Sequence, residues 1–250
     1  MLNILFTICG RAGSKGIKNK NLRIFCGKPL VYFSISVIDL YLQKHPEVNA
    51  DCVVNSDSME LIELVERNQR IHFEEIIREE SLSGDSVGKI DVIHDSLEKM
   101  QKRTGQHYNI VVDLDITSPL RTVRDLEDVI EIHTEKAADV TTTAAPARRN
   151  PYFNQVKKVE RGYKKVIDSN YTARQQAPRI FDLNASIYAY NPNYLNSGKG
   201  VLDGYCEIVE MADTGVLDLD HESDFELMEV IAAHLLNRNA GFREVFENIP

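Results

Sequence analysis

The residues with the clearest capacity for chemistry lie in one loop near the start of this 250-residue sequence. The loop reads Gly10-Arg11-Ala12-Gly13-Ser14-Lys15-Gly16-Ile17-Lys18-Asn19-Lys20-Asn21 and follows an apolar run over residues 2–9. Its glycines let backbone NH groups approach a ligand, and its cations add positive charge. The spacing fits neither the Walker A loop nor the dinucleotide-binding Gly-x-Gly-x-x-Gly pattern. The composition is typical of a phosphate-binding loop, and equally of a solvated basic turn.

Two Asp-x-Asp pairs, Asp113 with Asp115 and Asp218 with Asp220, are candidates for a metal site. In an extended segment alternate side chains point the same way, so either pair could face one hard cation. Magnesium fits, because it takes oxygen ligands and bridges carboxylates to substrate phosphates. Acidic residues ahead of a helix also serve as caps, so the residues alone do not choose between the pairs. The seven histidines show no zinc-binding spacing.

Composition narrows the class of protein further. The net charge of -9 argues against nucleic-acid binding, which needs a basic face. No apolar run reaches the roughly 20 residues of a membrane span, and the first residues lack the basic region of a signal peptide. The four cysteines form no Cys-x-x-Cys pair. We therefore expect a cytoplasmic protein whose basic loop binds a small anion.

Hydrophobic periodicity predicts alternating strands and helices, and hence a mostly parallel sheet covered on both faces. We expect strands at residues 2–9, 50–54, 71–77, 108–112, 140–145, 184–190 and 205–211. Helices are expected after Pro29, up to Arg67, over 90–100, up to Thr134 and over 225–235. Predicted helix caps are the pairs Asp57 with Glu60, Thr122 with Asp125, and Ser223 with Glu226.

Residues 153–160 and 163–168 flank Arg161-Gly162 and predict a β-hairpin with a tight turn. The surrounding segment is strongly basic. A two-stranded hairpin is marginal on its own, so it must pack on something. It could cover its own sheet or reach a second subunit, and in the latter case it would bring cations to that subunit's site.

Several segments together resemble the acylneuraminate cytidylyltransferases, the CMP-sialic acid synthetase family. The matching segments occur in the family's order along nearly the whole chain, and they are specific jointly rather than singly. They are Arg11 to Gly16 with Lys20-Asn21, Ser118-Pro119-Leu120-Arg121, Arg174-Gln175-Gln176, Asn184-Ala185-Ser186-Ile187-Tyr188, and Asp218-Leu219-Asp220.

The resemblance implies an α/β fold, a Rossmann-like three-layer sandwich with a protruding β-hairpin. It implies one nucleotidyltransferase domain over residues 1–250, in which 146–183 form a dimerisation and substrate-capping insertion of a homodimer. The implied reaction uses CTP to activate a nine-carbon α-keto sugar acid, giving CMP-sugar and pyrophosphate, with Mg²⁺ as cofactor.

The resemblance also carries roles onto individual residues. The residues implied in catalysis are Arg11, Lys20 and Asp220. Those implied in nucleotide binding are Arg11, Ser14, Lys15, Asn21 and Arg78. Those implied in binding the sugar acid are Asp115, Ser118, Arg174, Gln175 and Asn184. The metal-binding acids of the family match Asp218 and Asp220, and Arg174 would approach the sugar carboxylate, including from a neighbouring subunit.

The sequence departs from the family at one loop that faces the sugar. Similar sialic acid enzymes have Gln and Pro where this chain has Asp115 and Ile116, and Gly88-Lys89 replace a small polar pair. Asp115 could hydrogen bond a sugar hydroxyl or acetamido NH, or join the metal. With the basic segment 148–154, this resembles the branch acting on bacterial acids such as legionaminic acid. N-acetylneuraminate stays open as the substrate.

Three other functions fit parts of the pattern. An eight-carbon sugar acid (KDO) cytidylyltransferase resembles this fold but differs around residues 113–121. A glycosyltransferase also combines a nucleotide-binding α/β sheet with Asp-x-Asp. A non-catalytic nucleotide-binding module is the alternative outside enzymes.

Overall fold

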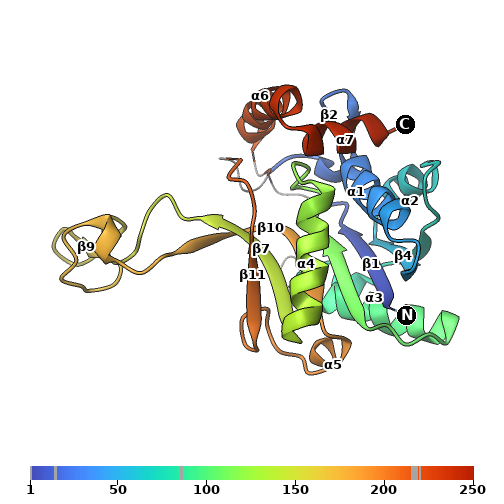
Figure 1. Cartoon of the computed structure of the whole chain (residues 1–250), viewed down its shortest axis with the longest axis horizontal. Helices are drawn as coiled ribbons and strands as arrows, with labels where there is room; N and C mark the ends of the chain where they lie inside the picture. The colour runs from blue at the N-terminus through green and yellow to red at the C-terminus, as the bar shows by residue number, and fades with distance from the viewer. Residues whose placement is uncertain (1, 14–15, 85–86, 215–218, 220) are drawn as a thin grey trace.

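The computed structural model of this chain describes residues 2–13, 16–84, 87–214, 219 and 221–250. Four predicted site residues, Ser14, Lys15, Asp218 and Asp220, lie outside these ranges. The described residues build a central seven-stranded sheet (Figure 1). From one edge to the other its strands are β11 (Cys206–Glu210), β7 (Val140–Pro146), β10 (Phe181–Tyr190), β6 (Ile110–Leu114), β1 (Asn3–Gly10), β4 (Asn49–Ser56) and β5 (Glu74–Ile77).

Every strand of this sheet except β10 runs in the same direction, as the alternating pattern predicts. The carboxyl ends of six strands therefore meet at one edge of the sheet. The chain leaves β1 toward β4 and β5, and then crosses back to β6 on the other side of β1. Ligands of open α/β sheets bind outside such a reversal point. The glycine-rich loop after β1 lies at this point.

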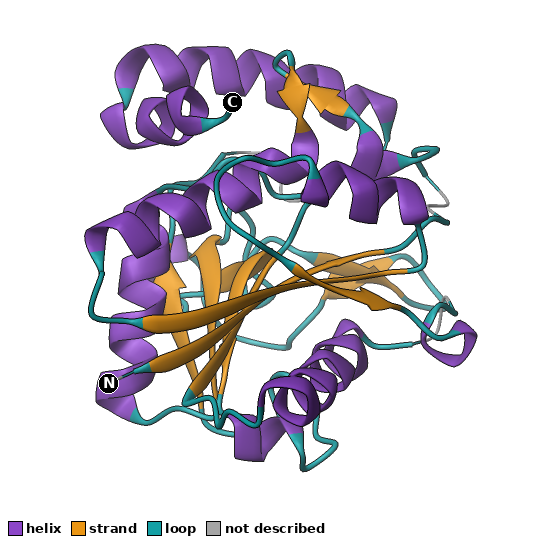
Figure 2. Ribbon diagram, turned by 90° about the vertical axis from the view of Figure 1, so that its right-hand side faces the viewer, coloured by secondary structure: helices purple, strands orange, loops and turns teal. Residues whose placement is uncertain are grey.

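Helices cover both faces of the sheet and make the three layers of the fold (Figure 2). One face is covered by α1 (Leu30–Lys44), α2 (Met59–Glu66) and α4 (Val123–Lys136). Two C-terminal helices, α6 (Glu222–Arg238) and α7 (Ala240–Asn248), extend this layer: they pack on each other, and α7 packs on α1. The other face is covered by α3 (Lys89–Thr104) and α5 (Pro192–Leu195).

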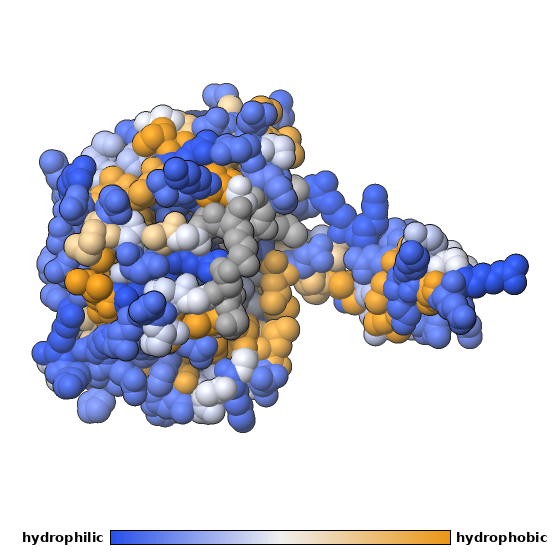
Figure 3. All heavy atoms as spheres, turned by 180° about the vertical axis from the view of Figure 1, so that it is seen from behind, coloured by the Kyte–Doolittle hydropathy of each residue, from blue (hydrophilic) through white to orange (hydrophobic). Residues whose placement is uncertain are grey.

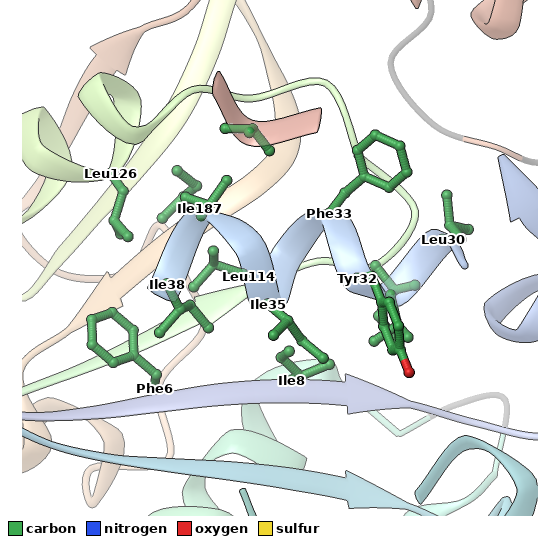
Figure 4. Packing of buried hydrophobic residues seen from close by; sticks show 14 of the residues in the cluster. Phe6, Ile8, Leu30, Tyr32, Phe33, Ile35, Ile38, Leu114, Leu126 and Ile187 are labelled. Atoms are coloured by element: carbon green, nitrogen blue, oxygen red, sulfur yellow. The ribbon is translucent and has the colours of Figure 1, made fainter. Parts of the chain in front are cut away.

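The central strand β1 is buried on both faces, and its side chains alternate between two apolar clusters. Ile4, Phe6 and Ile8 join the cluster under α1, whereas Leu5 and Cys9 join the cluster under α3. Figure 4 shows Phe6 and Ile8 facing residues of α1. Burial on both faces explains why the strand reads as one continuous apolar run instead of an alternating one.

The structure confirms one predicted helix cap and corrects two. Thr122 caps α4, because its hydroxyl oxygen accepts from Asp125 N at 3.3 Å, and the Asp125 carboxylate accepts in return from Thr122 N at 2.7 Å. Helix α2 is capped by Ser58, whose hydroxyl accepts from Leu61 N at 3.2 Å. Asp57, the predicted cap, instead accepts from Ala12 N at 2.7 Å.

The second correction concerns the start of α6. This helix begins at Glu222, and the backbone NH of His221 donates to Asp224 Oδ2 at 2.7 Å. The predicted pair of Ser223 and Glu226 therefore lies inside the helix. Helix α7 lies outside the predicted helices. It is only nine residues long and follows α6 after a single residue, Asn239.

Two antiparallel ribbons lie outside the main sheet. β2 (Ile24–Phe25) and β3 (Lys28–Pro29) form a short one before α1. β8 (Val156–Lys158) and β9 (Tyr163–Lys165) form the predicted hairpin, with Gly162 at φ 84° in its turn. The hairpin strands are shorter than predicted. The hairpin projects far from the body of the chain (Figure 1).

We expect Gly10→Ala to lower the free energy of unfolding by about 1–3 kcal/mol, the usual cost of overpacking a core. A Cβ at Gly10 would lie 2.4 Å from Leu61 Cδ2 and 3.0 Å from Asn21 Nδ2, and Leu61 is fully buried. Denaturant unfolding measures the change. Gly13→Ala is the matched control, because nothing lies within 4 Å of its added Cβ. Equal stability of the two variants would contradict the prediction.

Candidate functional site

The loop after β1 is tied to its neighbours by backbone contacts that fix its path. Ala12 N donates to Asp57 Oδ1 at 2.7 Å, joining the loop to the end of β4. The buried Asn21 donates from Nδ2 to Arg11 O at 3.1 Å, and Ile17 is buried in the core. The loop is therefore anchored at both ends. Two predicted nucleotide ligands, Arg11 and Asn21, lie side by side in it.

A pocket of about 150 Å³ lies between this loop and the start of α2. It is lined by Arg11, Ala12, Asn19, Asn21, Leu22, Ser58, Glu60 and Leu61. Asn19 holds a left-handed backbone conformation (φ 52°) that turns the chain into a short 3₁₀ turn over Lys20–Leu22. The pocket thus gathers backbone and side-chain donors from two strand ends.

Arg78 follows β5 and is buried against the end of β4. Its Nε and Nη2 donate to the side-chain and backbone oxygens of Asn55 at 3.1 and 2.7 Å. Asn55 in turn donates to Asp95 and Ser96 of α3, at 3.0 Å each. This network holds the Arg78 guanidinium at the carboxyl edge of the sheet. Asn55 was not singled out from the sequence, which carries no motif around it.

Lys89, the first residue of α3, lies between the carboxylates of the first Asp-x-Asp pair. Its Nζ is 2.6 Å from Asp113 Oδ2 and 2.7 Å from Asp115 Oδ2. Asp113 is fully buried and accepts from Thr7 Oγ1 at 2.8 Å. Asp115 Oδ1 accepts from the backbone and hydroxyl of Thr117, both at 2.9 Å.

These contacts fix the protonation of the cluster. Burial opposes ionisation of Asp115, but the charge of Lys89 and hydrogen bonds from Lys89 and Thr117 outweigh it and lower its pKa to about 2. Burial likewise opposes charging of Lys89, and the two aspartates outweigh it, so its pKa is raised. At neutral pH, Asp115 is thus an anion and a weak base, which does not suit a general base.

The fully buried Arg121 holds the loop that contains Asp115 and Ser118. Its guanidinium donates to the carbonyl oxygens of Asp115, Ser118 and Ser186, the last at 3.1 Å. Burial lowers the pKa of Arg121 to about 10, so it stays charged at neutral pH. The Ser-Pro-Leu-Arg motif found in the sequence thus has a structural role at Arg121.

Asn184 lies in an irregular part of β10, where the pairing with β7 shifts between Leu183 and Tyr188. Ala185 adopts a positive φ of 51°, which marks local strain in a residue other than glycine. Asn184 Oδ1 accepts from Thr143 Oγ1 at 2.6 Å. This irregularity directs the Asn184 side chain toward β7 and Met211, to which its Nδ2 donates at 3.4 Å.

Arg174 and Gln175 lie apart from the other predicted ligands, at the base of the hairpin. Both are exposed, and they line a separate pocket of about 310 Å³ with Asn150 and Pro178. Arg174 Nη2 donates to Ala147 O at 2.9 Å. Within one chain they therefore do not join the pocket beside the loop after β1.

The acids of the first Asp-x-Asp pair do not fit a metal ion, because Lys89 lies between them. In the part of the chain that the structure describes, no group of three His, Cys, Asp or Glu residues could hold a metal. The predicted metal pair, Asp218 and Asp220, lies outside this part. The chain is described again from His221 onward. Arg23, shortly after Asn21, makes a bidentate ion pair with Glu222, at 2.7 and 3.0 Å.

In the described part of the chain, no helix is long and apolar enough to cross a membrane.

Most predicted site residues that can be placed follow strand ends at the carboxyl edge of the sheet. They are Arg11, Lys20, Asn21, Arg78, Asp115 and Ser118, whereas Asn184 lies within β10. Sequence reasoning missed the ion pairs of Lys89, because residues far apart in the sequence make them.

A Rossmann-like sheet with a glycine-rich basic loop at its reversal point defines a nucleotide-binding class of protein. Residues 5–235 match the family described as Cytidylyltransferase. The chain belongs to this family, and it is a nucleotidyltransferase. The resemblance found in the sequence is therefore confirmed.

Two relatives are similar over nearly their whole length. The chain is 34% identical over 233 residues to a CMP-N,N'-diacetyllegionaminic acid synthase from Campylobacter jejuni subsp. jejuni serotype O:2, covering 92% of this chain and 95% of the relative. It is 32% identical over 232 residues, with the same coverage, to a post-translational flagellin modification protein B from Campylobacter coli.

A solved structure shares the fold. It is a CMP:2-keto-3-deoxy-manno-octonic acid synthetase complexed with CTP, with a TM-score of 0.64. The match covers 93% of this chain and 99% of the other, at 19% identity. At this identity the likeness shows the fold alone, and it confirms the predicted α/β class.

We expect the stabilising effect of Asp115 to disappear in acid. A carboxyl whose folded pKa lies below its unfolded value of about 4 stabilises the fold above that value and loses the effect as pH falls toward 2. Unfolding free energies of the wild type and Asp115→Asn should therefore converge by about 2 kcal/mol between pH 5 and pH 2. Denaturant titrations across this range measure it. If the difference between the two unfolding free energies stays constant across this pH range, the lowered pKa of Asp115 is refuted.

Proposed function

We propose that this chain transfers CMP from CTP to a nine-carbon α-keto sugar acid of the legionaminic type. The observation that carries the proposal is the 34% identity to the legionaminic acid synthase over 92% of the chain. The gathering of Arg11, Asn21, Arg78 and Asp115 at one edge of the sheet supports it. The alternative substrate, an eight-carbon sugar acid, is supported by a fold shared with the solved synthetase structure at 19% identity.

The reaction is an in-line displacement at phosphorus. The anomeric hydroxyl oxygen of the sugar acid forms a bond to the α-phosphorus of CTP. The bond from this phosphorus to the bridging oxygen of the β-phosphate breaks, and pyrophosphate leaves with the electron pair. The hydroxyl proton is lost to a base. The Asp115 carboxylate is already held by Lys89 and Thr117, and we assign the proton transfer to Asp220.

The chain's own residues then have distinct tasks. Backbone NH groups of the loop after β1, together with Ser14 and Lys15, would hold the triphosphate. Arg11 and Lys20 would offset the negative charge that develops on the leaving pyrophosphate. Asn21 and Arg78 would hold the nucleoside. Asp115 and Ser118 would face the sugar acid from the other half of the sheet, and Asn184, whose amide is held by Thr143 and Met211, would shape that side of the site.

We propose Mg²⁺ as the cofactor, held by Asp218 and Asp220. Such an ion neutralises phosphate charge during nucleotidyl transfer. The ion pair between Arg23 and Glu222 supports the assignment, because it brings the chain next to Asp220 close to the loop after β1. The pairing of Asp113 and Asp115 with Lys89 removes the competing site.

We expect pyrophosphate release when the chain is mixed with CTP, Mg²⁺ and a legionaminic-type acid, and none when EDTA is added. A panel of N-acetylneuraminic, legionaminic, pseudaminic and eight-carbon acids should give the highest kcat/KM for the legionaminic acid. Asp220→Asn should lose nearly all turnover while keeping its thermal midpoint. Silence with every acid would overturn the cytidylyltransferase activity, and a preference for another acid would overturn the substrate alone.

We also propose that the chain is a homodimer in which residues 146–183 cover the partner's site. Val156 and Tyr163 on the projecting hairpin are 60% and 69% exposed. Apolar surface gathers on this projection in Figure 3. A two-stranded hairpin with exposed apolar side chains lacks the burial it needs for stability. A second subunit would supply this burial and bring Arg174 and Gln175 to a site.

We expect the wild type to sediment as a dimer and Val156→Asp with Tyr163→Asp to sediment as a monomer with little activity, because each charge would be buried at the interface. Analytical ultracentrifugation and the pyrophosphate assay measure the two effects. Leu202→Asp is the matched control, since Leu202 is 63% exposed and lies outside the hairpin. A fully active wild-type monomer would refute the shared site.

A further inference from the structure

Lys89 joins the two halves of the candidate site. The chain reaches it from β5, on the half where Arg78 and the loop after β1 lie. Its ammonium group crosses to β6, where it contacts Asp113 and Asp115 at 2.6 and 2.7 Å. The cytidylyltransferase reaction needs a second substrate beside the nucleotide, and the β6 half of the same edge is where it can enter.

We propose that Lys89 is a positioning residue for the sugar acid. It holds the Asp115 carboxylate as an acceptor for an N–H or O–H group of that substrate, and it offsets negative charge that would repel the substrate's own carboxylate. This inference rests on the proposed function and refines it, since it places specificity for the sugar acid on an ion pair within the chain.

The geometry supports the first part of this role. Thr117 donates twice to Asp115 Oδ1, and Lys89 donates to Oδ2, so the carboxylate is held from two sides. The side chains of Asp115 and Lys89 are 19% and 32% exposed, so both reach the surface of the edge. Each carboxylate oxygen can accept more than one hydrogen bond. Asp115 is thus fixed in direction and able to bind a donor.

The charge balance supports the second part. Asp113 and Asp115 carry two negative charges, and Lys89 with the buried Arg121 carries two positive charges. The cluster is therefore neutral, and an anionic sugar acid can approach it. Without Lys89 the cluster would carry a net charge of about -1 next to two anionic substrates and would repel them.

The same ammonium group argues against a metal at this pair. A divalent cation held by both carboxylates would have to lie where Nζ lies, because Nζ is within 2.7 Å of an oxygen of each. Lys89 therefore acts as a built-in cation. The pair is free to serve the sugar side while the metal lies elsewhere.

The test is steady-state kinetics of Lys89→Met with CTP and the preferred sugar acid. Methionine keeps an unbranched stem and removes the charge. We expect the KM for the sugar acid to rise about tenfold or more, as when one partner of a buried ion pair is removed, and the KM for CTP to change less than about twofold. Lys89→Arg should keep the KM for the sugar acid near the wild-type value, because it keeps the positive charge.

Lys99→Met is the matched control. Lys99 lies on the same helix, is 29% exposed and pairs with two carboxylates, Asp95 at 2.8 Å and Glu79 at 3.2 Å. Its loss should leave the KM for the sugar acid unchanged. If Lys89→Met raises both KM values equally, or behaves like Lys99→Met, the positioning role is wrong.

A double variant keeps the test decisive if Lys89→Met folds poorly. Lys89→Met with Asp115→Asn removes one charge of each sign, so the cluster stays neutral and should fold. We expect its KM for the sugar acid to stay raised, because the charged acceptor is lost, and a wild-type value would overturn the inference. Absence of wild-type turnover would instead overturn the proposed function.

Discussion

The structure depends on the complete burial of β1 between two parallel neighbours. A strand with no polar face must satisfy all its backbone groups through β4 and β6, and this fixes its register on both sides. The register in turn places Gly10, Ser56 and Leu114 near one edge of the sheet. The register therefore also fixes where each loop at this edge begins. The site is therefore a consequence of the sheet, and the loops add the chemistry to it.

Charge is the second constraint, because the reversal point of the sheet gathers charged side chains where water is scarce. Asp113 and Arg121 are fully buried and the side chain of Lys89 is about a third exposed, and each is held by partners of opposite charge or by carbonyl oxygens. Such groups are costly to bury singly and tolerable in a balanced set. The balance also leaves the edge able to receive anionic substrates. Stability and function thus place the same demand on these residues.

The hairpin shows the opposite situation. Its strands are short, its apolar side chains are exposed, and its base carries Arg174, Gln175 and a pocket of its own. The body of the chain buries its core without this segment. The exposed side chains of Val156 and Tyr163 thus contribute little packing within one chain, and they fit a role between chains. A shared site would make assembly a condition for activity.

The sequence by itself determined which segments form the main strands, the mostly parallel character of the sheet, the Thr122 cap and the position of the glycine-rich loop after β1. These features are local, because a continuous apolar run, a capping pair or a glycine-rich loop is written in adjacent residues. Only the tertiary structure decided that Ser58 caps α2, that Lys89 lies between Asp113 and Asp115, and that Arg121 holds the following loop. These contacts join residues whose side-chain directions are set by packing. The spacing of two residues along the sequence does not tell how far apart their side chains lie in the fold. That distance is set by the sheet, which brings the ends of separate strands to one edge.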